Sequence, residues 1–169
     1  GALTFDTPAA LAPGGPTQYP VMAPLTRGVV VTWVSGPPTA GTIRVERRTG
    51  RTVTVVADGS VVNGRPMALE RAIGNLVDNA AKFDDSAHPI DVGVRNGTVT
   101  VRDHGPGIAA EDLAHVFDRF YRAAAARSKN GSGLGLAIVR DIATKHGGTV
   151  RVANAPDGGA IFTIALPTA

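Results

Sequence analysis

Four polar side chains on one predicted helix could line a site for a metal ion beside a phosphate. Asn75, Asp78, Asn79 and Lys82 recur at three- and four-residue spacing, so a helix would present them on one face. Asparagine is a mediocre helix former, because its amide competes for backbone hydrogen bonds. An amide oxygen is a hard ligand that suits Mg²⁺, and a lysine one turn further on could add a positive charge. The alternative is an ordinary solvated helix face.

Two glycine-containing segments could bind the rest of a nucleotide. Asp103 ends a predicted strand and is followed by Gly105 and Gly107. These glycines would let a flat base approach the backbone, while the carboxylate accepts a hydrogen bond from an exocyclic amine. The segment 131–136 leads directly into a helix, where free N–H groups and the helix dipole favour phosphate. Taken singly, the first is an ordinary strand-ending turn, and the second matches neither the Rossmann nor the Walker spacing.

Four positively charged residues lie between these two segments. The formal net charge is only +3, and aromatic residues make up 5%, too few for base-stacking platforms, so we expect no nucleic-acid partner. The cations between the glycine segments could neutralise a triphosphate, or they could serve only solubility. They are Arg119, Arg122, Arg127 and Lys129.

Hydrophobic periodicity predicts the elements that must position these groups. We expect strands over 43–48, 52–56, 90–95, 98–102, 149–153 and 160–166, and helices over 67–83, 110–117 and 134–146. The sequence Asn96-Gly97 is a strong hairpin signal. In the first helix an apolar stripe recurs at three- and four-residue intervals. The predicted fold is an α/β (α+β) two-layer sandwich, a mixed, mostly antiparallel sheet with helices covering one face.

Composition excludes several classes of protein. The 169 residues suffice for one domain with a sizeable core, and no cysteine is present for a disulfide scaffold, a Cys-ligated zinc site or a thiol nucleophile. Apolar runs are short and no signal peptide opens the chain, so we expect no membrane insertion and a cytoplasmic location. Residues 1–40 are rich in proline and glycine and predict an irregular arm, with one possible strand at 29–34. The regular domain is expected over 41–169.

Taken together, the segments carry a family resemblance. They read NLVDNAAKF at 75–83, DHGPG at 103–107, FDRFYR at 117–122 and GSGLGL at 131–136. In order and spacing they resemble the N, G1, F and G2 boxes of the catalytic and ATP-binding domain of sensor histidine kinases, within the gyrase–Hsp90–histidine kinase–MutL superfamily. The resemblance covers about residues 52–167 and implies a Bergerat-type site for ATP and Mg²⁺.

The resemblance also implies individual roles. By motif position Asn79 would coordinate Mg²⁺, Asn75 would support the same polar network, and Lys82 would approach the phosphates. Arg122 would lie near the γ-phosphate in a lid, and Asp103 would hold the adenine amine. The expected nucleotide contacts are Asn79, Lys82, Phe83, Asp103, Gly105, Gly107, Ile108, Phe117, Phe120, Gly131, Ser132, Gly133, Leu134, Gly135, Leu136 and Thr163. Of these, Phe117 and Phe120 would anchor the lid by packing, and Gly133 and Gly135 would let it hinge.

Two departures from the family pattern bear on the chemistry. Phe83 stands where the family commonly has tyrosine, so a hydroxyl contact to the nucleotide is lost. Asn75 stands where the superfamily's ATPases have the glutamate that activates water. An amide is not a general base, so the sequence favours transfer of the phosphoryl group over hydrolysis of ATP.

The phosphate acceptor is not evident in this chain. None of the four histidines, His88, His104, His115 and His146, lies in the family's phosphoacceptor motif, and no receiver pattern is found. We therefore expect the γ-phosphate to pass to a histidine on a separate dimerisation domain or protein, and from there to a response regulator. The chain is then either a fragment of a longer kinase or one half of a split kinase. Two alternatives are an anti-sigma-type serine kinase and a nucleotide-sensing module without turnover.

Overall fold

A single mixed sheet is the frame of the molecule. The computed structural model describes residues 41–46, 52–57, 62, 64–123, 129 and 131–168. Within them six strands lie in the order β1-β2-β3-β4-β6-β5, with β2 and β3 parallel and the other neighbours antiparallel. The strands are β1 (Gly41–Glu46), β2 (Thr52–Ala57), β3 (Ile90–Arg95), β4 (Thr98–Arg102), β5 (Thr149–Asn154) and β6 (Ala160–Ala165). The expected arm at 1–40, its possible strand and the expected turn at 49–50 lie outside the described residues.

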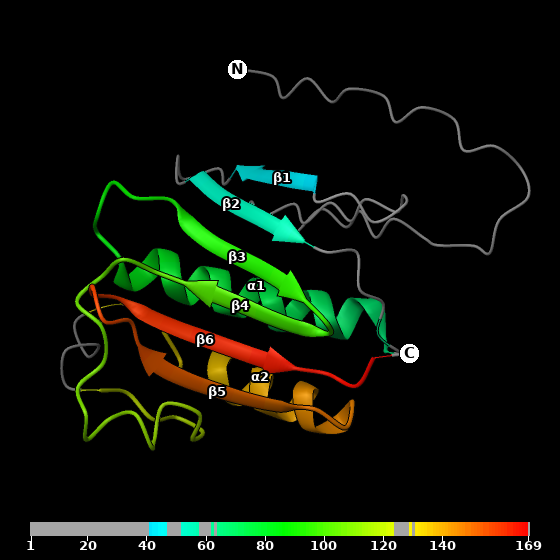
Figure 1. The fold of residues 1–169 in the computed structure, drawn as a ribbon. Helices are drawn as coiled ribbons and strands as arrows, with labels where there is room; N and C mark the ends of the chain where they lie inside the picture. The colour runs from blue at the N-terminus through cyan, green and yellow to red at the C-terminus, as the bar shows by residue number, and fades with distance from the viewer. Residues whose placement is uncertain are drawn as a thin grey trace, which may run out of the picture.

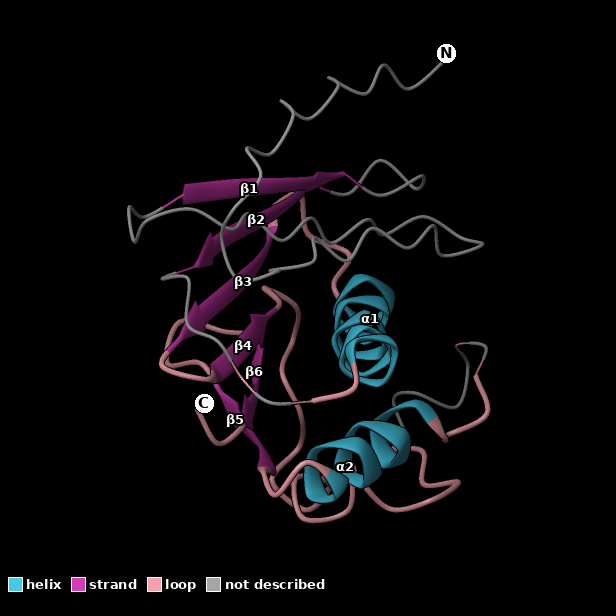
Figure 2. Ribbon diagram, turned by 90° about the vertical axis from the view of Figure 1, so that its right-hand side faces the viewer, coloured by secondary structure: helices cyan, strands magenta, loops and turns pink. Residues whose placement is uncertain are grey.

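Two helices cover one face of this sheet. α1 (Pro66–Phe83) connects β2 to β3, and α2 (Gly135–Lys145) lies between β4 and β5 in the chain. Parallel strands need a crossover connection, and α1 supplies it. Figures 1 and 2 show both helices on the same side of the strands, which confirms the predicted two-layer sandwich. In the described part of the chain, neither helix is long and apolar enough to cross a bilayer.

The core forms where the apolar stripe of α1 meets the sheet. Leu76 and Ala80 are 0% exposed, and the neighbouring stripe residues Ala72, Ile73 and Val77 are also buried. Every second residue of β3 and β4 points into the same layer, as alternation predicts. The opposite side of α1 therefore remains for polar groups, with Asn75, Asn79 and Lys82 half-buried.

Local signals set several boundaries. Pro66 stands at the start of α1, where a missing N–H removes no helical hydrogen bond. Asn96 and Gly97 both have positive φ, 48° and 70°, and they join β3 to β4 in the expected register, Arg95 opposite Thr98.

One predicted element is wrong. Residues 110–117 form a series of turns instead of a helix. Amides there bond at both three- and four-residue spacing, as when Asp112 and Leu113 both donate to the Ala109 carbonyl, at 2.9 and 3.2 Å. A segment this short gains little from helical cooperativity, so packing of its ends determines its path.

Candidate functional site

The polar face of α1 meets the beginning of α2. The side-chain amide of Asn75 donates to the Gly135 carbonyl at 3.2 Å, so the first asparagine joins the two helices. One turn further, Asn79 is half-buried and its side chain makes no hydrogen bond to the described residues. The Asn79 amide oxygen is thus open to a ligand, and an amide oxygen suits Mg²⁺.

Three cations gather at the end of α1. A Cβ built on Gly131 would lie 2.6 Å from Lys82 Nζ, so this lysine reaches the glycine segment. Arg122 Nη2 donates to the Lys129 carbonyl at 2.7 Å, and Lys129 Nζ donates to the Lys82 carbonyl at 2.8 Å. Burial lowers the pKa of Lys82, and the charges of Arg122 and Lys129 lower it further. An anion placed among these three cations would relieve their repulsion.

The aromatic ring of Phe83 lies beneath two of these charges. Lys82 Nζ is 4.7 Å and Lys129 Nζ is 5.7 Å from the ring centroid. The negative face of a phenyl ring attracts ammonium groups at such distances. Phe83 therefore keeps a packing role although it lacks the tyrosine hydroxyl. Asp85 adds an ion pair to Lys129 at 3.0 Å.

Asp103 is a buried carboxylate fixed at the end of β4. It is 4% exposed, and Oδ1 accepts the N–H groups of Gly105 at 3.0 Å and Ala160 at 3.1 Å. Oδ2 accepts no hydrogen bond from the described residues. A carboxylate oxygen held in this way can accept a hydrogen bond from an amino group of a ligand.

Glycines permit the close approaches around this carboxylate. A Cβ on Gly105 would lie 2.7 Å from the Phe83 carbonyl oxygen. Gly107 has a φ of +78°, and a Cβ there would lie 2.9 Å from Asn154 Oδ1. These positions exclude other residues for steric reasons.

The expected lid segment begins with two phenylalanines in different environments. Phe117 is 9% exposed and packs edge-on against Phe162, with ring centroids 6.2 Å apart. Phe120 is 70% exposed, so the expectation that it packs is wrong. Its backbone takes a left-handed φ of 63°, in which its N–H donates to the Gly133 carbonyl at 3.0 Å. Gly133, with φ +71°, cannot carry a Cβ because one would lie 2.8 Å from the Phe120 carbonyl carbon.

The remaining predicted contacts divide into three groups. Ile108 and Leu136 pack against the core cluster. Ser132 and Gly135 are exposed, and Leu134 caps α2 at its N-terminus. Thr163 is not brought to the site, because Phe162 and Ile164 on either side of it point into the core and alternation turns Thr163 to the opposite face of the sheet.

Two residues of this region were missed by sequence reasoning. Asp84 is 1% exposed, and its carboxylate accepts the His104 N–H at 3.1 Å. Asn154, at the end of β5, exchanges two hydrogen bonds with the backbone of Ile108, at 2.8 and 2.7 Å. The sequence offered one signal for Asp84, namely its position directly after the last residue of an amphipathic helix.

Comparison with known proteins shows the family of the chain. The model of the histidine kinase-, DNA gyrase B- and HSP90-like ATPase family matches residues 64–169. The sensor histidine kinase component HK1 of Mycobacterium tuberculosis is 45% identical over 123 residues, which cover 71% of this chain and 73% of that protein. The signal transduction histidine-protein kinase AfsQ2 of Streptomyces coelicolor is 47% identical over 107 residues, 60% of this chain. The chain spans only 20% of the length of AfsQ2.

A solved structure gives the same result for the fold. The mycobacterial sensor histidine kinase MprB superposes with a TM-score of 0.57 at 40% sequence identity, over 63% of this chain and 76% of that one. The segment that the family model matches contains both helices and the glycine segments described above, and the family description names an ATPase. The chain therefore belongs to the histidine kinase-, DNA gyrase B- and HSP90-like ATPase family, on its histidine kinase branch.

Proposed function

We propose that this chain binds Mg-ATP and transfers the γ-phosphate to a histidine of another domain or protein, which passes it to a response regulator. The main support for the proposal is that the site has a carboxylate at one end and a group of cations at the other. A buried carboxylate with an open oxygen, Asp103, and the cations Lys82, Arg122 and Lys129 flank the same end of α1. A ligand with an amino group at one end and several negative charges at the other fits this pattern, and ATP has both.

Each residue then has a physical role. Asp103 Oδ2 accepts the adenine amine, and the three cations neutralise the triphosphate. Asn79 would hold Mg²⁺ together with the phosphate oxygens, and the bound ion supplies neutralisation of the charge that develops during transfer. The residues bring the reactants together and orient them, and this positioning is a large part of how proteins catalyse phosphoryl transfer.

Transfer is favoured over hydrolysis by the state of Asn75. Its amide is already engaged with the Gly135 carbonyl at 3.2 Å, and an amide does not take up a proton from water. The histidine kinase names of the relatives favour a histidine acceptor over the serine kinase alternative, and transfer over a module without turnover.

We infer that the acceptor histidine is none of the four in these 169 residues and lies on another domain or another protein. All four histidines belong to this domain. His104 pairs with Asp91 at 3.0 Å, His115 with Asp118 at 3.1 Å, and His146 contacts the Ile142 carbonyl at 2.7 Å. His88 lies against the ring of His104. The relative from Mycobacterium tuberculosis is named a component of a sensor histidine kinase, which agrees with an arrangement of separate chains.

The test is a transfer assay between two proteins. The chain is mixed with Mg-ATP labelled at the γ-phosphate and with a candidate dimerisation protein that carries the acceptor histidine. We expect acid-labile, base-stable label on the partner, absent when the chain carries Asn79→Ala. Label that remains on this chain alone, or release of free phosphate without any labelled protein, would contradict the proposal.

A further inference from the structure

Asp84 is a buried carboxylate that the proposed chemistry does not use. It is 1% exposed and directly follows the last residue of α1, where its N–H still donates to the Ala80 carbonyl. A buried carboxylate is costly unless it is well hydrogen-bonded, so its presence needs a reason. We propose that Asp84 is a positioning residue that holds the Asp103 loop in the geometry that selects adenine. This inference rests on the proposed function.

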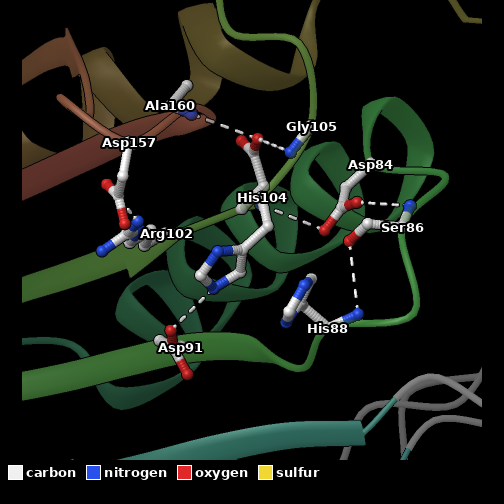
Figure 3. Close-up of polar contacts among 10 residues, drawn as sticks. Asp84, Ser86, His88, Asp91, Arg102, His104, Gly105, Asp157 and Ala160 are labelled. Atoms are coloured by element: carbon white, nitrogen blue, oxygen red, sulfur yellow. Dashed lines mark hydrogen bonds and ion pairs between the residues drawn. The ribbon is translucent and has the colours of Figure 1, made fainter.

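The first support is the set of contacts that Asp84 makes. Oδ1 accepts the Ser86 N–H at 2.7 Å, and this hydrogen bond holds the segment that follows the helix against Asp84. Oδ2 accepts the His104 N–H at 3.1 Å, from a loop 20 residues further along the sequence (Figure 3). His104 is the neighbour of Asp103, so the hydrogen bond acts on the backbone that carries the base-binding carboxylate.

The second support is the packing of the next residue. Gly105 lies so close to the helix end that a Cβ on it would be 2.7 Å from the Phe83 carbonyl oxygen and 3.2 Å from Asp84 Cα. The Gly105 N–H donates to Asp103 Oδ1 at 3.0 Å. Asp84 thus holds the N–H of His104, and Asp103 accepts from the next N–H along the chain, that of Gly105.

A third contact fixes the side chain of His104. The His104 ring pairs with Asp91 on β3 at 3.0 Å (Figure 3). With its backbone bound to Asp84 and its ring bound to β3, His104 has little freedom, and the direction of Asp103 Oδ2 is set by rigid elements. Precise direction matters because adenine presents an amino donor where guanine presents a carbonyl acceptor, and a carboxylate accepts from the first and repels the second.

The test compares ATP with GTP in Asp84→Asn. The asparagine keeps the size of the side chain but turns an NH₂ group toward one of the two amide donors, which loses its acceptor. We expect the preference for ATP over GTP, measured by titration calorimetry, to fall about tenfold. The affinity for inorganic tripolyphosphate, which has no base, should stay unchanged. Asp141→Asn is the matched control, a carboxylate on α2 paired only with Lys145 among the described residues.

The outcomes separate the two proposals. Wild-type protein that does not bind ATP, or does not prefer it to GTP, would overturn the proposed function and this inference with it. A wild-type preference for ATP that Asp84→Asn retains would overturn the inference alone. A loss of thermal stability with an unchanged ATP-to-GTP ratio would show a purely structural role and would also overturn it.

A second measurement does not depend on folding of the variant. In wild-type protein the His104 amide should exchange its hydrogen slowly, because it is bonded to a buried carboxylate, and ATP should slow it further. Exchange of this amide at the rate of an exposed one would overturn the proposal, whatever the variant does.

Discussion

At the scale of single residues, Asp103 is the residue that we propose to recognise the base. Its Oδ1 is occupied by two backbone amides, so Asp103→Ala removes the oxygen proposed to meet the ligand and also leaves the amides of Gly105 and Ala160 without an acceptor. We expect this change to weaken ATP binding by about 2 kcal/mol, the usual value of a charge-assisted hydrogen bond. Titration calorimetry measures it, with tripolyphosphate as the ligand that should be insensitive. Unchanged ATP affinity in Asp103→Ala would contradict the proposal that Asp103 binds adenine.

Lys82 carries a testable dependence on pH. Burial and the charges of Arg122 and Lys129 place its pKa below 10.5 in the folded protein. Between that lowered pKa and 10.5 the folded chain binds fewer protons than the unfolded chain, so the free energy of unfolding rises with pH across this interval. If the triphosphate binds beside Lys82 as proposed, it should stabilise the charged form and raise the pKa of Lys82 again.

The corresponding variant is Lys82→Gln, which removes the charge. Its free energy of unfolding without ligand should equal or slightly exceed that of the wild type, while its affinity for tripolyphosphate should fall about tenfold. Urea titrations above pH 8 and calorimetry in buffers of different ionisation enthalpy measure the two effects. Proton uptake on binding that persists in Lys82→Gln would show that another group titrates.

At the scale of elements, one side chain adds a hydrogen bond to the packing between α1 and α2. Asn75 donates to the Gly135 carbonyl across 60 residues of sequence, at the start of α2. We expect Asn75→Ala to lower the free energy of unfolding by about 1 kcal/mol and to weaken ATP binding, because the glycine segment before α2 loses its support. Arg71→Ala, at an exposed position of the same helix, is the control for helix propensity. Equal effects of the two changes would contradict the junction.

The elements that local sequence determines were predicted well. The stripe on α1 and the Asn96-Gly97 turn are short-range patterns, and both appear in the structure almost to the residue. The predicted helix at 110–117 failed because packing of Phe117 and the path to Phe120 determine that segment. Thr163 was assigned to the site from motif likeness, although its strand register turns it away from the helices.

The contacts that complete the site could not be predicted from local sequence. Asp84 bonds to a residue 20 positions away and Asn154 to one 46 positions away. Such contacts form only when the folded sheet brings the ends of β4 and β5 close to the end of α1. Periodicity states which face of an element is buried, but it does not state which loop comes to lie against which helix end.

At the scale of the whole molecule, the hydrogen bonds that build the site within the described residues lie between residues 65 and 160. From the change in composition near residue 41 we propose a domain boundary near residue 40, with the nucleotide site on its C-terminal side. β1, which begins at Gly41, pairs with β2 and completes the sheet, so it belongs to the domain. A chain that begins at Gly41 should then retain the complete site.

Thermal unfolding provides the test of this boundary. A ligand at one hundred times its dissociation constant stabilises a protein by about 2.7 kcal/mol, which raises Tm by roughly 5–10 °C for a domain of this size. The chain from Gly41 and the full chain should show the same rise with Mg-ATP, and neither should respond to Mg²⁺ alone. A rise that is smaller in the shortened chain, at equal Tm without ligand, would mean that residues 1–40 contribute to the nucleotide site. The boundary would then have to move toward the N-terminus.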